Sequence, residues 1–186
     1  MMVSSPVWAL TPIPGSNFKV HIVAARNYRS SDLEKLKQAA AVVETIMNSV
    51  EFKNNILNFS YQGSKEFVQN NGLSNEQLYE YLMAGAEKYP VQMQPLNTME
   101  VEFELYKPKL FSQRGVIGWT NTSISTIYVN QKYYRTEAIA DVADNMVHEW
   151  CHKMGFDHDF NYTDRRPYSV PYGVGDLVGR MINGEQ

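Results

Sequence analysis

Three histidines and one glycine in the last third of the chain have the residue types and the spacing of a catalytic metal site. His148 and His152 are four residues apart, so on a helix both imidazoles project from one face, one turn apart. That spacing lets two ring nitrogens reach one zinc ion at about 2.0–2.1 Å. Gly155 permits a sharp turn that brings His158 back as a third ligand, and the fourth position is left for water.

Glu149 is the expected general base of this group. It follows His148 directly, off the core face of the helix, where it reaches a zinc-bound water without being a ligand. Five positions are fixed in the string: His148, Glu149, His152, Gly155 and His158. At roughly one in twenty per position, chance gives about one match in three million starting points. The alternative interpretation is a structural cluster of histidines that are satisfied in a core or on a surface.

The string HEWCHKMGFDH resembles the HExxHxxGxxH signature of the metzincin clan of zinc peptidases. The resemblance implies a zinc endopeptidase with an upper sheet-and-helix subdomain, a cleft and a smaller lower subdomain. Carried over by position, His148, His152 and His158 would be the ligands and Glu149 the base. Asp159 follows the third histidine, as an aspartate does in the adamalysin-like branch, and its alternative role is that of a turn carboxylate.

Tyr172 is the second candidate catalytic residue, and it lies where the metzincins have a methionine-containing turn. The segment 168–173 (YSVPYG) resembles the serine–aliphatic–methionine–x–tyrosine turn of astacins and serralysins with one residue missing, so that Pro171 stands near the methionine position. In that turn the tyrosine binds zinc or stabilises the oxyanion, and a phenol suits both tasks. The alternatives are a tyrosine packed at the edge of the core, and Met181 as the methionine.

Several other residues with functional side chains are expected to be structural. Cys151 points about 60° away from His148 on an ideal helix, which favours a small buried residue over a ligand. His21 lies in an expected strand. The carboxylates Asp157, Asp164 and Glu137 do not form a loop with the spacing of a calcium site.

The segment before the last strand has a role only by resemblance. In the metzincins this region forms an edge strand that pairs with the extended substrate backbone, which would assign that role to Gly118, Trp119 and Thr120. The alternative for Trp119, as for the pair Tyr133-Tyr134, is packing.

The elements that position these residues follow from the spacing of apolar side chains and from turn and capping residues. In chain order they are a strand over 18–24, a helix from Ser30 to about Ser49, a strand over 56–61, a helix from Ser74 to Tyr89, strands over 99–106, 115–121 and 126–130, the helix from Thr136 to Gly155, and a helix over 174–182. The strand 99–106 alternates and is expected to have one wet face. The segment 156–172 is polar and rich in turns.

The composition is that of an ordinary globular chain. The 186 residues are 44% hydrophobic and 20% charged, with a net charge of −3, which does not favour a nucleic-acid partner. We expect the α+β class, with a mixed twisted sheet, helices above it and a small loop-rich C-terminal subdomain. The length favours one domain over 1–186, with an upper subdomain at about 15–155 and a lower one at about 156–186.

The remaining expectations concern location and partners. No stretch approaches the ~20 apolar residues of a membrane span. The first fifteen residues lack a basic n-region and contain three prolines, so they do not read as a signal peptide. The resemblance favours secretion, and a cytoplasmic location stays open. With a single cysteine, no internal disulfide forms, and a propeptide that blocks zinc through another cysteine is excluded for this chain.

The predicted function is zinc-dependent hydrolysis of peptide bonds, with a water on zinc activated by Glu149, Tyr172 assisting, and a protein or peptide as substrate. The oligomeric state is expected to be a monomer. Two alternatives remain open: a zinc-bearing binding module without activity, and a zinc amidase that acts on a non-protein substrate. Retention of Glu149 argues against the inactive module, because a structural site needs no general base.

Overall fold

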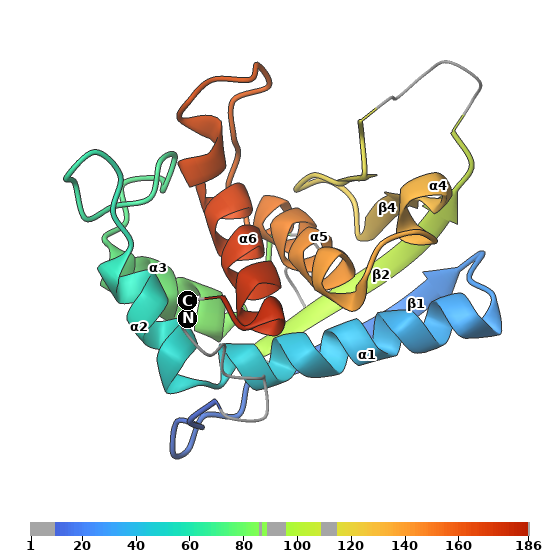
Figure 1. The fold of residues 1–186 in the computed structure, drawn as a ribbon, viewed down its shortest axis with the longest axis horizontal. Coiled ribbons are helices and arrows are strands. Elements are labelled where there is room, and N and C mark those ends of the chain that lie inside the picture. Colours follow the sequence, from blue (N-terminus) through green and yellow to red (C-terminus); the bar gives the residue numbers. More distant parts are fainter. Residues whose placement is uncertain (1–9, 86, 89–95, 109–114, 186) are drawn as a thin grey trace.

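A four-stranded mixed sheet and six α-helices form the part of the chain that our computed structural model describes, residues 10–85, 87–88, 96–108 and 115–185 (Figure 1). The strands are β1 (Lys19–Arg26), β2 (Thr98–Tyr106), β3 (Gly118–Trp119) and β4 (Thr126–Asn130). Their order is β1-β2-β4-β3, with β1, β2 and β4 parallel and β3 antiparallel to β4. The expected α+β class is therefore confirmed at this level.

The central strand β2 has the alternation predicted from its sequence. Its buried side chains on one face are Met99, Val101, Phe103 and Leu105, and the residues between them are partly exposed. On the partly exposed face, Glu102 forms an ion pair with Arg26 of β1 at 3.0 Å, and Glu100 lies 3.5 Å from Nδ1 of His21. One face of the sheet thus forms the core, and the other carries charged pairs.

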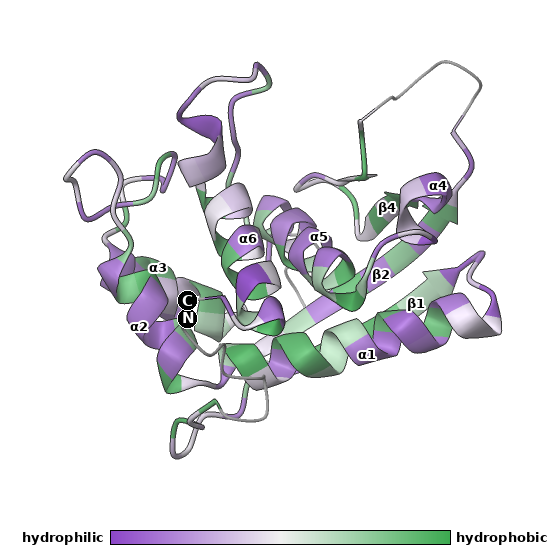
Figure 2. Ribbon diagram, viewed as in Figure 1, coloured by the Kyte–Doolittle hydropathy of each residue, from purple (hydrophilic) through white to green (hydrophobic). Residues whose placement is uncertain are grey.

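The helices cover the buried face of the sheet. They are α1 (Ser30–Met47), α2 (Val50–Asn58), α3 (Asn75–Ala84), α4 (Gln131–Tyr134), α5 (Ile139–Lys153) and α6 (Val170–Asn183), with a short 3-10 helix, η2, at Arg166–Tyr168. α1 packs on both β1 and α5, and α6 packs along α5 (Figure 1). Figure 2 shows hydrophobic and hydrophilic residues interleaved along α1, α5 and α6, as expected of helices with one buried face. Among the described helices, none combines the length and the apolar character that crossing a membrane requires.

The predicted strand over 56–61 is wrong. Residues 50–58 form α2, and Ser49 caps its N-terminus: the Ser49 hydroxyl accepts a hydrogen bond from the Phe52 amide at 3.1 Å. Phe52 and Ile56 are both buried and lie four residues apart on one face. The short apolar run was compatible with either element, and the helical cap upstream decides it.

Other boundaries differ from the predicted ones. α3 ends at Ala84 because Gly85 takes a left-handed conformation (φ 66°), and part of its predicted C-terminal end lies outside the described residues. Of the predicted strand 115–121, only Gly118–Trp119 pairs as β3. The helix with the histidine string begins at Ile139 and not at Thr136.

The last helix is longer than predicted, and this changes the interpretation of segment 168–173. α6 begins at Val170, with Ser169 before it and Pro171 in its first turn, where the missing amide hydrogen of proline disrupts no helical hydrogen bond. Tyr172 therefore lies on the first turn of a helix. The C-terminal segment is rich in loops only before η2.

Glycines bring α6 very close to α5. A Cβ atom added at Gly175 would lie 2.9 Å from the backbone oxygen of Asp144 and 3.2 Å from the Cβ of His148. One turn later, a Cβ at Gly179 would lie at an ordinary 3.4 Å from the Cβ of Asp144. α6 is therefore held against the same turn of α5 that carries the first histidine.

Candidate metal centre

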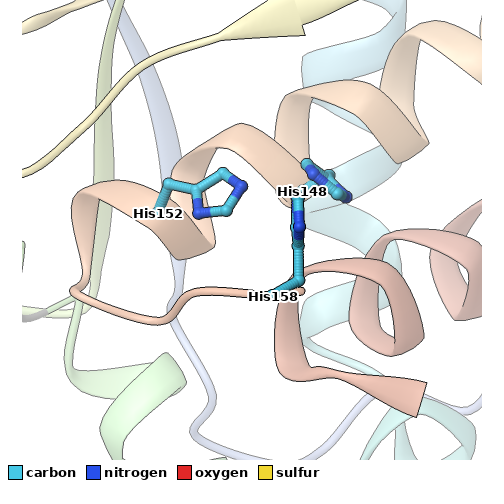
Figure 3. Close-up of side chains that lie close together, drawn as sticks. All are labelled: His148, His152 and His158. Carbon is cyan, nitrogen blue, oxygen red and sulfur yellow. The ribbon is translucent and has the colours of Figure 1, made fainter. Parts of the chain in front are cut away.

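α5 carries two of the three histidines on its C-terminal half. Its apolar face is buried in the core and consists of Val142, Ala143, Met146, Val147 and Trp150. His148 is buried and His152 is partly buried, and their ring centroids lie 5.0 Å apart. The four-residue spacing therefore places both imidazoles beside one point, as predicted (Figure 3).

A turn at Gly155 returns the chain toward these two histidines. Gly155 has a φ of 93°, and the Phe156 amide donates to the Cys151 carbonyl at 3.1 Å, the hydrogen bond of a glycine-terminated helix end. Phe156 is buried against Tyr81, with perpendicular rings 5.7 Å apart. This anchor fixes the direction in which the chain leaves the helix, and His158 follows two residues later.

The three imidazoles converge (Figure 3). The ring of His158 lies 5.3 Å from that of His148 and 4.9 Å from that of His152. One nitrogen from each of the three rings lies within 4.8 Å of the other two. In the described part of the chain, this is the one group of three or more His, Cys, Asp or Glu side chains that could hold a metal ion.

Backbone carbonyls orient the histidine rings. Nδ1 of His152 lies 2.8 Å from the Phe156 carbonyl oxygen, and Nδ1 of His158 lies 3.1 Å from that of Asp159. Because a carbonyl oxygen only accepts, Nδ1 carries the proton in each neutral ring and Nε2 keeps its lone pair for an ion. The arrangement is typical of metal-binding histidines, whose second nitrogen donates to a carbonyl or a carboxylate.

Burial keeps the imidazoles neutral. It is the largest cause that lowers the pKa of all three, most strongly for His148. The neighbouring histidines lower the pKa of His148 further, and a hydrogen bond to the Pro171 carbonyl partly offsets the effect. Neutral rings are the form that binds a metal ion.

Glu149 lies beside the histidines on α5 and faces the edge strand β3. It is only 3% exposed, and its Oε2 has no hydrogen-bond partner. A Cβ at Gly118 would lie 2.9 Å from its Oε1, so the glycine makes room for the carboxyl group. Burial raises the pKa of Glu149 to about 8, against a smaller opposing contribution from the Thr120 backbone.

Tyr172 lies against the histidines from the other side. Its ring centroid is 4.4 Å from that of His148 and 4.8 Å from that of His158. Its hydroxyl accepts a hydrogen bond from Nη2 of Arg166, the first residue of η2. Sequence reasoning missed Arg166, because no spacing rule connects an arginine of η2 to a tyrosine in the first turn of the next helix.

A buried ion pair fixes the C-terminal end of α5 to the sheet. Lys153 is 1% exposed, and its Nζ lies 2.7 Å from Oε2 of Glu87 and 2.9 Å from the Glu100 carbonyl oxygen of β2. Trp150 Nε1 donates to the other oxygen of Glu87 at 2.8 Å. Burial raises the pKa of Glu87, and Lys153 partly offsets this effect. Sequence patterns gave no sign of this network, since its partners are far apart in the chain.

The residues expected to be structural lie outside the histidine group. Cys151 is fully buried, and burial raises the pKa of its thiol. His21 lies on the charged face of the sheet. Asp159, for which an adamalysin-like role and that of a turn carboxylate were both open, accepts a hydrogen bond from the Thr163 hydroxyl at 2.7 Å, as a turn carboxylate does. Asp157 is an exposed side chain 3.7 Å from Nδ1 of His152.

No protein-family model matches this sequence, and a search of curated proteins finds no match either. The functional argument therefore depends on the geometry of the histidine group and its neighbours.

Proposed function

We propose that this protein is a zinc-dependent peptidase of the metzincin type, in which His148, His152 and His158 hold the ion. The observation that carries the proposal is the convergence of three imidazoles, with one nitrogen of each ring within 4.8 Å of the other two. Backbone carbonyls bind Nδ1 of His152 and of His158, so Nε2 of each of these two rings stays available to an ion. The order of the elements also supports the proposal, since a short antiparallel edge strand precedes the helix that carries the ligands, as was expected from the resemblance to the metzincins.

The donor set suits zinc. Three neutral nitrogen ligands with a free fourth position are the arrangement of catalytic zinc sites, whereas calcium and magnesium prefer oxygen ligands. The lowered pKa values of the three histidines agree with neutral donors at neutral pH. When bound, zinc would supply a Lewis acid that lowers the pKa of water to about 7 and polarises a carbonyl oxygen.

The chain's own residues supply the remaining chemistry. Glu149 accepts a proton from the attacking water and passes it to the leaving amine, which is the work of a general base and then a general acid. Its unpartnered Oε2 is available for that proton, because no side chain or backbone donor occupies it. Tyr172 is close enough to the rings of His148 and His158 for its phenol to assist a negatively charged oxygen.

The edge strand β3 offers a place for the substrate backbone. Among the described residues, β3 pairs with a strand on one side only, β4, so its other side has backbone groups available for an extended peptide. Gly118 of this strand lies against Glu149, which would bring a peptide on β3 close to the base. The proposal therefore favours a peptide substrate over a compact small molecule.

Metal analysis combined with cleavage of a peptide library tests the proposal. We expect one zinc ion per chain, lost on chelation, and cleavage that depends on zinc. Glu149→Gln should keep zinc and fold and lose at least the ~10²–10⁴-fold typical of acid–base catalysis. Asn145→Gln, on the same side of α5 but without an acid–base group, is the matched control. A zinc content near zero, or near-normal turnover in Glu149→Gln, contradicts the proposal.

A further inference from the structure

Arg166 is held in one orientation beside the histidine group. Its Nη2 donates to the Tyr172 hydroxyl, and its Nη1 donates to the Phe160 carbonyl at 3.3 Å. The guanidinium also lies over two aromatic rings, 4.7 Å from the centroid of Tyr162 and 4.9 Å from that of Tyr172. Two rings and two hydrogen bonds fix the plane of its donors.

The charge of Arg166 has no anionic partner within the described residues. No carboxylate forms an ion pair with it there, and its buried Nε has no acceptor. Asp159, a nearby carboxylate in the sequence, is bonded to the Thr163 hydroxyl. Arg166 is partly exposed, so its guanidinium, which no carboxylate neutralises, is available beside the histidine group to an anion from outside.

A bound metal ion increases this need for an anion. The positive charge of Arg166 already acts on His148 and His158, the two histidines nearest to Tyr172. Three neutral imidazoles do not compensate a divalent ion, so the site would combine the charge of the ion with that of the arginine.

We propose that Arg166 binds a carboxylate of the substrate, so that the preferred peptide carries an acidic side chain or a free C-terminal carboxylate next to the cleaved bond. The inference rests on the proposed zinc peptidase function and names its substrate class. The planar fork of a guanidinium matches the two oxygens of a carboxylate. Access is open, because Arg166 itself is only partly buried.

Two hydroxamates that differ only in charge test the proposal on the zinc-loaded full chain. Succinic acid monohydroxamate carries a terminal carboxylate, and its terminal amide is the neutral counterpart. Since hydroxamates bind zinc directly, both should bind, and titration calorimetry measures the difference. We expect the carboxylate to bind about tenfold or more tightly, and the preference to shrink at high ionic strength. Malonic and glutaric analogues cover other separations between the ion and the arginine.

Three variants assign the preference to Arg166. Arg166→Gln should remove it, and Arg166→Lys should reduce it, because lysine keeps the charge and loses the fork. Arg165→Gln is the matched control, since this neighbouring arginine is exposed, and it should keep the full preference. Zinc content and thermal unfolding are measured for each variant. If Arg166→Gln does not fold, the comparison of the wild type with Arg166→Lys still tests the fork.

The outcomes separate the two proposals. If both hydroxamates bind the wild type equally at every length, the carboxylate inference is overturned and the zinc site stands. If zinc is bound stoichiometrically but neither hydroxamate binds, both proposals fail.

Matched peptides then distinguish the source of the carboxylate: a preference for Glu over Gln indicates an acidic side chain, and a preference for a free over an amidated C-terminus indicates a terminal carboxylate. Absence of both preferences contradicts the inference.

Discussion

The orientation of each histidine ring is set by the backbone and not by another side chain. His152 and His158 each direct Nδ1 to a carbonyl oxygen within the segment 156–159, which follows the helix directly. The turn at Gly155 therefore has two functions: it brings His158 back and it supplies the acceptor for His152. A change in this turn would misdirect two potential ligands together.

The difference between a ligand and a buried neighbour is testable with two substitutions. His158→Ala should weaken zinc binding at least 10-fold, because it removes one of three donors. Cys151→Ser should change zinc affinity little, since Cys151 points into the core and lies outside the histidine group. Competition with a chelator measures both affinities. Equal zinc affinities in the two variants would show that the ligand assignment is wrong.

Tyr172 gives a second prediction at this scale. Tyr172→Phe removes the hydroxyl that accepts from Arg166 and keeps the ring that packs on His148 and His158. We expect kcat to fall about 10- to 10³-fold, the range of one oxyanion donor, with little change in the melting temperature. Tyr168→Phe, on the exposed face of η2, is the control and should be neutral. Unchanged kinetics in Tyr172→Phe would exclude a role of the phenol.

Among the elements, the helices α5 and α6 matter most to the candidate site, because they approach each other closely beside His148. Gly175 lies against the backbone of Asp144 and the Cβ of His148, so α6 has no room for a side chain there. One turn later on α6, a side chain has more room, because a Cβ atom at Gly179 would lie at an ordinary contact distance from α5. The first histidine and Tyr172 are thus positioned relative to each other by a helix–helix contact.

The contact between these helices predicts opposite effects of two identical substitutions. Gly175→Ala should destabilise the protein by roughly 1–3 kcal/mol and weaken zinc binding, since its methyl group meets the backbone of α5. Gly179→Ala should be neutral or stabilising by up to about 1 kcal/mol, because alanine favours the helix and meets no backbone atom at a short distance. Chemical denaturation measures both free energies of unfolding. Equal destabilisation in the two variants would contradict the close approach at Gly175.

The long elements with clear periodicity were predictable, and so was the histidine string. β2 alternates over the eight residues 99–106 and α1 has helical spacing over eighteen, and both lie where the pattern predicts them. α2 was not predictable in the same way, because the six residues 56–61, four of them apolar, fit either a strand or a helix. The start of α6 was missed because the segment 168–173 was interpreted as a turn from its resemblance to that of astacins and serralysins, although Pro171 is equally suited to the first turn of a helix. The contacts of Glu87 and Arg166 depend on tertiary packing alone.

At the scale of the whole molecule, one buried apolar cluster extends from Phe18 to Met181. It includes residues of the sheet and of α1, α5 and α6, and Lys153 joins α5 to β2 through the Glu100 carbonyl and to Glu87, which precedes β2 in the chain. The division into an upper and a lower subdomain stays a prediction. Because the histidine helix is embedded in this core, the stability of the site is tied to that of the fold.

The pH dependence of stability follows from Asp144 on α5. Burial, followed by Asp176, Asp141 and Glu137, raises the pKa of Asp144 from 3.8 to about 7. The folded state therefore keeps on Asp144 a proton that the unfolded state releases, so the contribution of Asp144 to stability falls as the pH rises from about 4 to about 7 and is constant above that range. Asp144→Asn removes this dependence. Measured by denaturation, the variant should match the wild type near pH 4 and gain relative stability by at most about 1.4 kcal/mol per pH unit above it.

Asp176→Asn on α6 is the control for that measurement. It removes the largest like-charge contribution at Asp144 and leaves the burial of Asp144 in place. The pH dependence should therefore become weaker and remain measurable. A wild-type curve parallel to that of Asp144→Asn at all pH values would contradict a raised pKa for Asp144.

Cys151 is the one cysteine of the sequence, and its reaction with a thiol reagent can report when the helix α5 detaches from the core. Its thiol is fully buried and its pKa is raised, so a thiol reagent reacts with it only after the helix detaches from the core. The labelling rate then measures how often that detachment occurs in otherwise native protein. Since the thiol lies between His148 and His152 without being a ligand candidate, an ion held by those histidines would slow labelling without blocking the sulfur itself. The kinetics of a single chemical modification would thus report the occupancy of the histidine group.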